Sequence, residues 1–141
     1  MIVLIKKVSL KEEISNMLEI ISTEKTPAAI GPYSQAVKAG GFLFLSGVMP
    51  IDPAANALVE SEITAQAGQI MKNVDAVLTA AGYSAADVVK TTCFLSDIGN
   101  FAAFNKVYGE YFTGKPARSC IAAKDLPKGA LVEVEVIAYK D

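Results

Sequence analysis

The clearest hydrophobic pattern in the chain is a helical one in its middle. Apolar residues recur there at spacings of three or four, which is the period of one helical face. They are Ile63, Ala67, Ile70, Val74, Val77 and Ala81. Ser61 is the expected N-cap, Glu62 falls in the first turn, and Gly82 suits the C-terminal cap. The pattern predicts one amphipathic helix between Ser61 and Gly82.

A second apolar stripe with helical spacing follows Asp97, where we expect another helix to begin. The stripe consists of Ile98, Phe101, Phe104, Tyr108 and Tyr111. Gly114 and Pro116 end the pattern, because proline cannot continue a helix. We expect the aromatic side chains of this stripe to belong to the core.

Short runs rich in β-branched and aromatic residues predict strands around these helices. They cover residues 18–23, 34–39, 42–46, 88–95, 117–123 and 131–139. Gly40 and Gly41 join the second and third runs as a hairpin, since glycine supplies the positive φ angles of tight turns. The run 88–95 is typical of a strand covered on both faces. Residues 50–59 are expected to be a loop, and residues 124–129 a turn-rich link.

This order of elements suits an α+β layer, a single domain with both helices packed on one face of a sheet. The other face has no helix left to cover it, although the predicted strands are apolar on both sides. Such a face usually finds its cover in another copy of the chain. We therefore expect a closed oligomer.

Composition narrows the classes of function. The 141 residues are 52% hydrophobic and 20% charged, which suits one well-buried core. A net charge of −2 argues against binding of a nucleic-acid backbone as the main activity. The chain has no histidine, so acid–base chemistry must use other groups. Cys93 and Cys120 form no CxxC pair and no disulfide framework, which favours the cytoplasm.

Residues 1–16 stand apart from this pattern as an N-terminal extension. The apolar run 2–5 precedes the first lysines and no small-residue cleavage site follows it, so we predict neither a signal peptide nor a membrane span. An extra strand or a short helix is the expected structure. The main domain is predicted to cover residues 17–141.

Arg118, Cys120 and Glu133 are the candidates for chemistry. We expect them on two neighbouring strands, where a guanidinium, a thiol and a carboxylate could bind an acid and steer a water. Each has a simpler interpretation: a surface ion-pair arginine, a small buried hydrophobe, and one member of a solvated face that Glu133 shares with Glu135. A buried Glu133 would need a partner, and Arg118 is available.

Several motifs in register resemble the Rid family, also called YjgF or L-PSP. They are Ile30-Gly31-Pro32-Tyr33-Ser34-Gln35-Ala36, Ser46-Gly47, Pro116-Ala117-Arg118-Ser119, and Leu126-Pro127 with Val132-Glu133-Val134-Glu135. The best-known members of this family are 2-iminobutanoate/2-iminopropanoate deaminases. The resemblance implies a chorismate-mutase-like fold, a homotrimer, active sites in clefts between subunits, and no cofactor or metal.

The resemblance also implies roles for individual residues. Arg118 matches the arginine that grips the substrate carboxylate, and Glu133 matches the carboxylate that positions or activates water. Cys120 matches a residue that lines the pocket beside the imine. Further pocket positions are matched by Tyr33, Ser46, Gly47 and Asn105. The implied substrates are small 2-imino or enamine carboxylic acids.

Two other functions remain open at this point. A non-catalytic metabolite-binding or chaperone-like trimer would use the same arginine and bind carboxylates without releasing ammonia. An endoribonuclease or translation inhibitor is the other alternative. The chain shows no histidine pair, basic stripe or aromatic platform that favours RNA chemistry.

Overall fold

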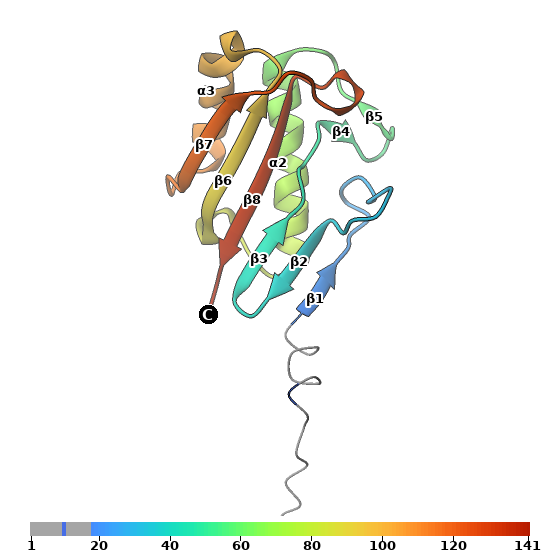
Figure 1. The fold of residues 1–141 in the computed structure, drawn as a ribbon, viewed down its shortest axis with the longest axis vertical. Coiled ribbons are helices and arrows are strands. Elements are labelled where there is room, and N and C mark those ends of the chain that lie inside the picture. The colour runs from blue at the N-terminus through green and yellow to red at the C-terminus, as the bar shows by residue number, and fades with distance from the viewer. Residues whose placement is uncertain (1–9, 11–17) are drawn as a thin grey trace, which may run out of the picture.

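The predicted strands and helices form one sheet with two helices behind it, as Figure 1 shows. The computed structural model describes residue 10 and residues 18–141. The predicted extension over residues 1–16, with its extra strand or short helix, lies outside the described residues except for Leu10. In the described part of the chain, no helix combines the length and the hydropathy needed to cross a membrane.

The main sheet has six strands in the order β1-β2-β3-β8-β6-β7. Their bounds are β1 Leu18–Ile21, β2 Ala36–Ala39, β3 Phe42–Leu45, β6 Val88–Leu95, β7 Ala117–Ala122 and β8 Val132–Tyr139. Strands β6 and β7 pair in parallel and the other neighbours are antiparallel, so the sheet is mixed. Helices α2 (Ile63–Ala80) and α3 (Phe101–Tyr111) cover one face of it. This confirms the predicted α+β architecture.

The segment predicted as a loop over residues 50–59 contains a small hairpin instead. Its strands are β4 (Ile51–Asp52) and β5 (Ala57–Leu58). The turn between them uses Asn56 at φ 51°, a left-handed conformation that asparagine tolerates better than most residues. Asp52 Oδ1 accepts a hydrogen bond from the Ala54 N–H at 2.9 Å. Strands this short carry too little periodicity to be detected in the sequence.

Helix α2 begins one residue later than predicted, because Glu62 rather than Ser61 is its N-cap. The Glu62 carboxylate accepts hydrogen bonds from the N–H groups of Thr64 and Ala65 at 2.9 and 2.8 Å. These bonds lower the pKa of Glu62, since they stabilise its charged form. At the other end Gly82 adopts φ 81°, which confirms its predicted role after the last turn.

Helix α3 also begins later than predicted. Asp97 caps a short 3-10 turn over Ile98–Asn100, and the α-helix starts at Phe101. Phe104 and Tyr108 are buried as expected, whereas Ile98 and Phe101 are 56% and 36% exposed. The prediction of a core position is therefore wrong for Phe101. Its ring lies 5.5 Å from the guanidinium carbon of Arg118 instead.

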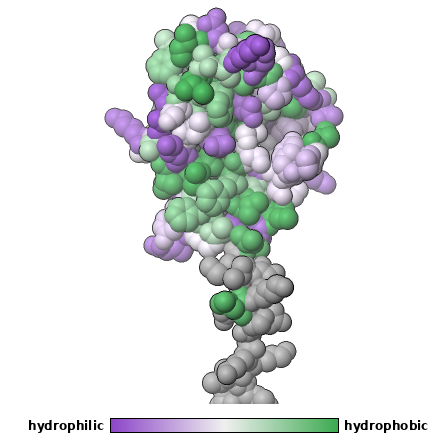
Figure 2. Space-filling view, viewed as in Figure 1, coloured by the Kyte–Doolittle hydropathy of each residue, from purple (hydrophilic) through white to green (hydrophobic). Residues whose placement is uncertain are grey.

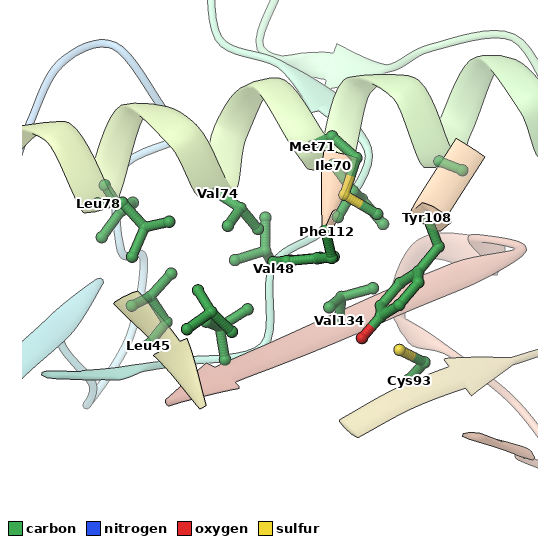
Figure 3. Close-up of a cluster of buried hydrophobic side chains, with 14 of the residues drawn as sticks. Leu45, Val48, Ile70, Met71, Val74, Leu78, Cys93, Tyr108, Phe112 and Val134 are labelled. Carbon is green, nitrogen blue, oxygen red and sulfur yellow. The ribbon is translucent and has the colours of Figure 1, made fainter. Parts of the chain in front are cut away.

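The hydrophobic core lies between the two helices and the sheet. Alternate residues of β8 and β6, including Val134 and Cys93, point toward the helices and are fully buried. Ile70, Val74 and Leu78 of α2 face them, as Figure 3 shows. Phe104 and Tyr108 of α3, together with Phe112, close one end of this core. The helical period of the sequence thus determines which sides of α2 and α3 meet the sheet.

The opposite face of the sheet is uncovered in the single chain. Phe42 and Phe44 are each 44% exposed, and the Phe42 ring lies 4.9 Å from that of Tyr139. Figure 2 views this face and shows hydrophobic side chains gathered over its lower part. Val89 of β6 is 43% exposed, so the prediction that this strand is covered on both faces is wrong for the chain alone. The face remains a surface that association could bury.

Candidate functional site

Glu133 lies on the uncovered face of β8, where it alternates with the buried residues Val132 and Val134. Its carboxylate packs directly against Gly47, in the segment that follows β3. A Cβ placed on Gly47 would overlap Glu133 Oε1. The segment is fixed by a pair of backbone hydrogen bonds between Val48 and Val134, with N···O distances of 2.8 and 3.2 Å. Only glycine at position 47 therefore lets the carboxylate lie where it does.

Ser46 and Tyr33 belong to the same neighbourhood. Ser46 Oγ donates a hydrogen bond to the Ser34 carbonyl at 2.6 Å, and the Ser46 N–H donates to the Gln35 carbonyl at 3.0 Å. Tyr33 is 53% exposed. Four predicted site residues, Tyr33, Ser46, Gly47 and Glu133, line one cavity of about 520 Å³. The structure brings this half of the predicted site together.

Burial raises the pKa of the half-buried Glu133, and repulsion from Glu135 raises it further. Both effects disfavour a charged carboxylate. The shift brings the pKa of Glu133 closer to neutral pH. A carboxyl group exchanges protons most effectively when its pKa lies near the working pH. The pKa of Glu133 is thus shifted in the direction that general acid–base chemistry near neutral pH would require.

Arg118 of β7 lies in a different neighbourhood, against helix α3. Its Nη1 donates a hydrogen bond to Asn105 Oδ1 at 2.6 Å, and its guanidinium carbon lies 4.7 Å from the centre of the Tyr108 ring. The Tyr108 hydroxyl is in turn hydrogen-bonded to Thr91 Oγ1 at 2.7 Å. The amide and the rings hold the guanidinium in one orientation. A smaller hollow of about 310 Å³ lies beside it.

Cys120 is on the same side of β7 as Arg118 and lies opposite Cys93 of β6 in register. Burial raises the pKa of Cys120, although the nearby Arg118 acts in the opposite direction. Burial also raises the pKa of Cys93 to about 12. A raised pKa keeps Cys120 in the thiol form at neutral pH, which makes it a weak nucleophile.

The two halves of the predicted site lie on opposite faces of the sheet. Strand β6 separates β7 from β8, so the expectation that Arg118 and Glu133 occupy neighbouring strands is wrong. Arg118 is paired in register with the buried Thr91 and points toward the helices, whereas Glu133 is paired with Phe94 on the uncovered face. Arg118 is therefore not the partner of Glu133 within one chain.

Sequence reasoning missed two residues that build these half-sites. Tyr108 was expected only in the core, yet its ring also packs against the guanidinium of Arg118. Gln35 is buried and its side chain binds Thr23 and Pro27. A glutamine directly before the apolar residues Ala36 and Val37 was the available signal. Among residues 10 and 18–141, the Cys, Asp and Glu side chains form no group of three that could hold a metal ion.

Comparison with known proteins places the chain in a family. The sequence pattern described as "Endoribonuclease L-PSP" matches residues 23–140. The chain belongs to the Rid/YjgF/L-PSP family. A RutC family protein of Pyrococcus horikoshii is 51% identical over 126 residues, which cover 89% of this chain and 100% of that protein.

Solved structures of the Rid family agree with the fold. YyfA of Yersinia pestis, titled a protein of unknown function of the conserved Rid family, is 48% identical with a TM-score of 0.85. The match covers 87% of this chain and 99% of YyfA. Escherichia coli TdcF with bound serine is 38% identical with a TM-score of 0.83, and the match covers 87% and 99% of the two chains. The Rid-family fold is therefore shown for this chain.

Proposed function

We propose that this Rid-family protein is an enamine/imine deaminase, which hydrolyses reactive 2-imino acids to 2-oxo acids and ammonia. The observation that carries the proposal is the fixed guanidinium of Arg118. This group has more N–H donors than its contact with Asn105 uses. The rings of Phe101 and Tyr108 lie against it and fix its orientation. A planar, oriented guanidinium is the group best suited to bind a carboxylate through two parallel hydrogen bonds.

The opposite placement of Arg118 and Glu133 supports an active site between two copies of the chain. Arg118 belongs to the edge strand β7, and Glu133 lies on the uncovered apolar face of the sheet. A second copy that packs on this face would bury its aromatic side chains and could bring an Arg118 to the cavity beside Glu133. We propose a homotrimer in which each site combines the Arg118, Asn105 and Cys120 of one subunit with the Tyr33, Ser46, Gly47 and Glu133 of its neighbour.

The proposed reaction needs only positioning and proton transfer. The enamine acid tautomerises to the imine, and Arg118 holds its carboxylate. Glu133 takes a proton from a water as the water oxygen adds to the imine carbon, and it gives that proton to the imine nitrogen. In the resulting tetrahedral intermediate the hydroxyl proton passes through Glu133 to the amino group, the C–N bond breaks, and the 2-oxo acid and ammonia are released. Proton transfer by a positioned carboxyl group contributes on the order of 10²- to 10⁴-fold. No step transfers an electron or requires a nucleophilic thiol, which agrees with the raised pKa of Cys120.

A non-catalytic metabolite-binding protein is the alternative that the same geometry permits. TdcF, one of the similar structures, contains bound serine, a small α-amino acid with a carboxylate like that of the proposed substrates. Binding of such an acid would require Arg118 but not proton transfer by Glu133. The two functions therefore differ in the expected effect of a Glu133 substitution.

The test is the loss of 2-iminobutanoate, generated in situ from threonine and trapped by semicarbazide. We expect the wild-type protein to suppress semicarbazone formation, and Arg118→Ala to reduce kcat/KM on the order of 10²-fold or more, because a buried charge pair with the substrate is lost. Glu133→Gln should bind 2-oxobutanoate yet lose turnover. Lys106→Ala, which removes an exposed cation of α3, is the matched control. Wild-type activity in Arg118→Ala, or none in the wild type, would contradict the proposal.

A further inference from the structure

The cavity beside Glu133 extends well beyond the residues that the proposed reaction uses. Its polar end is formed by Ser46, Gly47 and Glu133. Its lining continues to Met49, Ile51 and Val77, whose side chains are apolar. Ile51 is 8% exposed and Val77 is 2% exposed, so this part of the lining belongs to the rigid interior of the fold. The cavity lining thus combines polar groups with apolar side chains, and Asn56 and Lys128 also belong to it.

Two buried side-chain amides fix the walls of this cavity. Asn73 of α2 is 1% exposed, and its Nδ2 donates hydrogen bonds to the carbonyls of Met49 and Ile51 at 3.1 and 2.9 Å. Its Oδ1 accepts a hydrogen bond from Gln69 at 3.0 Å, which orients the amide. The apolar wall is therefore held by specific hydrogen bonds rather than by loop packing alone.

Another part of the lining is held in the same way by Gln35. Its Oε1 accepts a hydrogen bond from the Thr23 N–H at 2.7 Å, and its Nε2 donates to the carbonyls of Thr23 and Pro27 at 3.1 and 2.8 Å. These bonds fix the segment that contains Pro27 and Ala28, two residues of the cavity lining. Two clamped walls make the cavity a preformed site, as small-molecule sites usually are.

We infer that this cavity receives the side chain of the substrate, and that the protein prefers 2-imino acids with branched or aromatic apolar side chains over 2-iminobutanoate. The identity of the substrates as imino acids rests on the proposed deaminase function. With the imine carbon beside Glu133, the side chain points away from the carboxylate end, toward Met49, Ile51 and Val77. An acidic side chain would meet Lys128, which also lines the cavity, whereas a basic side chain would lose its hydration beside Met49, Ile51 and Val77 without a matching partner.

The size of the cavity supports this preference. In the single chain its volume is about 520 Å³, part of which the neighbour's Arg118, Asn105 and Cys120 would occupy in the proposed trimer. This volume lies within the range of roughly 300–1,000 Å³ that is typical of small-molecule sites. A four-carbon imino acid fills on the order of 150 Å³, when each heavy atom takes somewhat less than the share of about 30 Å³ of one water. Each further methylene that leaves water should improve binding about fourfold.

The experiment compares acids of increasing side-chain size in binding and in turnover. Binding of 2-oxobutanoate, 4-methyl-2-oxopentanoate and 3-phenyl-2-oxopropanoate is measured by calorimetry. The corresponding imino acids are generated from the amino acids by an L-amino-acid oxidase, and their hydrolysis is followed with semicarbazide. We expect 4-methyl-2-oxopentanoate, which has two more carbons, to bind about sixteenfold more tightly than 2-oxobutanoate, and kcat/KM to rise in the same order.

A cavity-filling variant separates this preference from general hydrophobicity. Ala28→Phe places a ring at an exposed loop position of the lining, where it should not disturb the core. We expect Ala28→Phe to remove most of the gain in affinity and in kcat/KM that the longer acids show over the four-carbon acid. Ala86→Phe changes an exposed alanine outside the lining and should leave the series unchanged.

The possible failures are distinguishable. A series with no dependence on side-chain size, or one that Ala28→Phe does not alter, overturns the inference about the cavity. Turnover of 2-iminobutanoate in that case still supports the deaminase. If no imino acid is hydrolysed, the deaminase proposal fails, and the size dependence of 2-oxo acid binding still decides whether the cavity receives apolar side chains.

Discussion

At the scale of single residues, Gly47 determines where the carboxylate of Glu133 can lie. The carboxylate occupies the space that a Cβ at position 47 would take. Gly47 and Glu133, which make this contact, line the same cavity as Tyr33 and Ser46, two further residues of the proposed site. The position of a carboxylate in the proposed site thus depends on the absence of a side chain at position 47.

Replacing Gly47 by alanine should reduce turnover with little effect on folding. The new Cβ displaces Glu133, whose side chain can move, and a displacement of this kind can cost on the order of 10²-fold in rate. kcat/KM for 2-iminobutanoate and the melting temperature are the measurements. Gly68→Ala is the control, because nothing lies within 4 Å of the Cβ it would add in α2, and helix propensity predicts a gain of about 0.5–1 kcal/mol. Wild-type turnover in Gly47→Ala would contradict the importance of this contact.

At the scale of elements, the start of α2 shows how a cap positions a long helix. Glu62 binds two N–H groups of the first turn. The same helix carries Asn73, which holds the wall of the cavity. The register of α2 therefore links its cap to the site, because a shift of the helix would displace Asn73 relative to Met49 and Ile51.

Glu62→Ala should lower the melting temperature at neutral pH, and the difference from the wild type should vanish in acid. The pKa of Glu62 is lowered in the folded protein. Its contribution to stability is thus present above the ordinary value of 4.5 and is lost as the pH falls through the folded-state value. Thermal unfolding between neutral pH and pH of about 3 measures this. Glu60→Ala, which removes an exposed carboxylate outside the cap, should show no such pH-dependent difference.

At the scale of the whole molecule, the decisive feature is that the two halves of the site face opposite sides of the sheet. Arg118 is held against α3, and Glu133 lies on the face that Phe42, Phe44 and Tyr139 make apolar. Association of copies through this face would bury the aromatic residues and could complete the site. Assembly and activity should therefore depend on each other.

Mixing two inactive variants tests the shared site directly. Arg118→Ala and Glu133→Gln, unfolded together and refolded as mixed oligomers, should recover about a quarter of wild-type activity, because about one site in four then receives both intact halves. Light scattering verifies the size of the oligomer.

The control mixes Arg118→Ala with Asn105→Ala. Both substitutions affect the half-site that contains Arg118 and Asn105. This half-site is therefore damaged in every site of the mixture, and activity should not recover. Absence of recovery in the first mixture, with oligomers of wild-type size, would contradict a site shared between subunits.

The sequence by itself determined the two α-helices, the six strands of the main sheet and most of their buried faces. The stripe from Ile63 to Ala81 predicted α2, and alternation along β8 correctly placed Glu133 and Glu135 on one face. These patterns are local, because a helix or strand repeats its own period. The motifs likewise led to the family, which the comparisons confirm.

Only the tertiary structure decided which strands are neighbours. The crossover through α3 places β7 parallel to β6, and β8 returns on the other side of β6. For that reason Arg118 and Glu133 are separated, and Phe101 meets a guanidinium rather than the core. The cavity wall at Met49 and Ile51 likewise depends on Asn73, more than twenty positions away. Strand order and such clamps arise from contacts between distant segments, which no local period encodes.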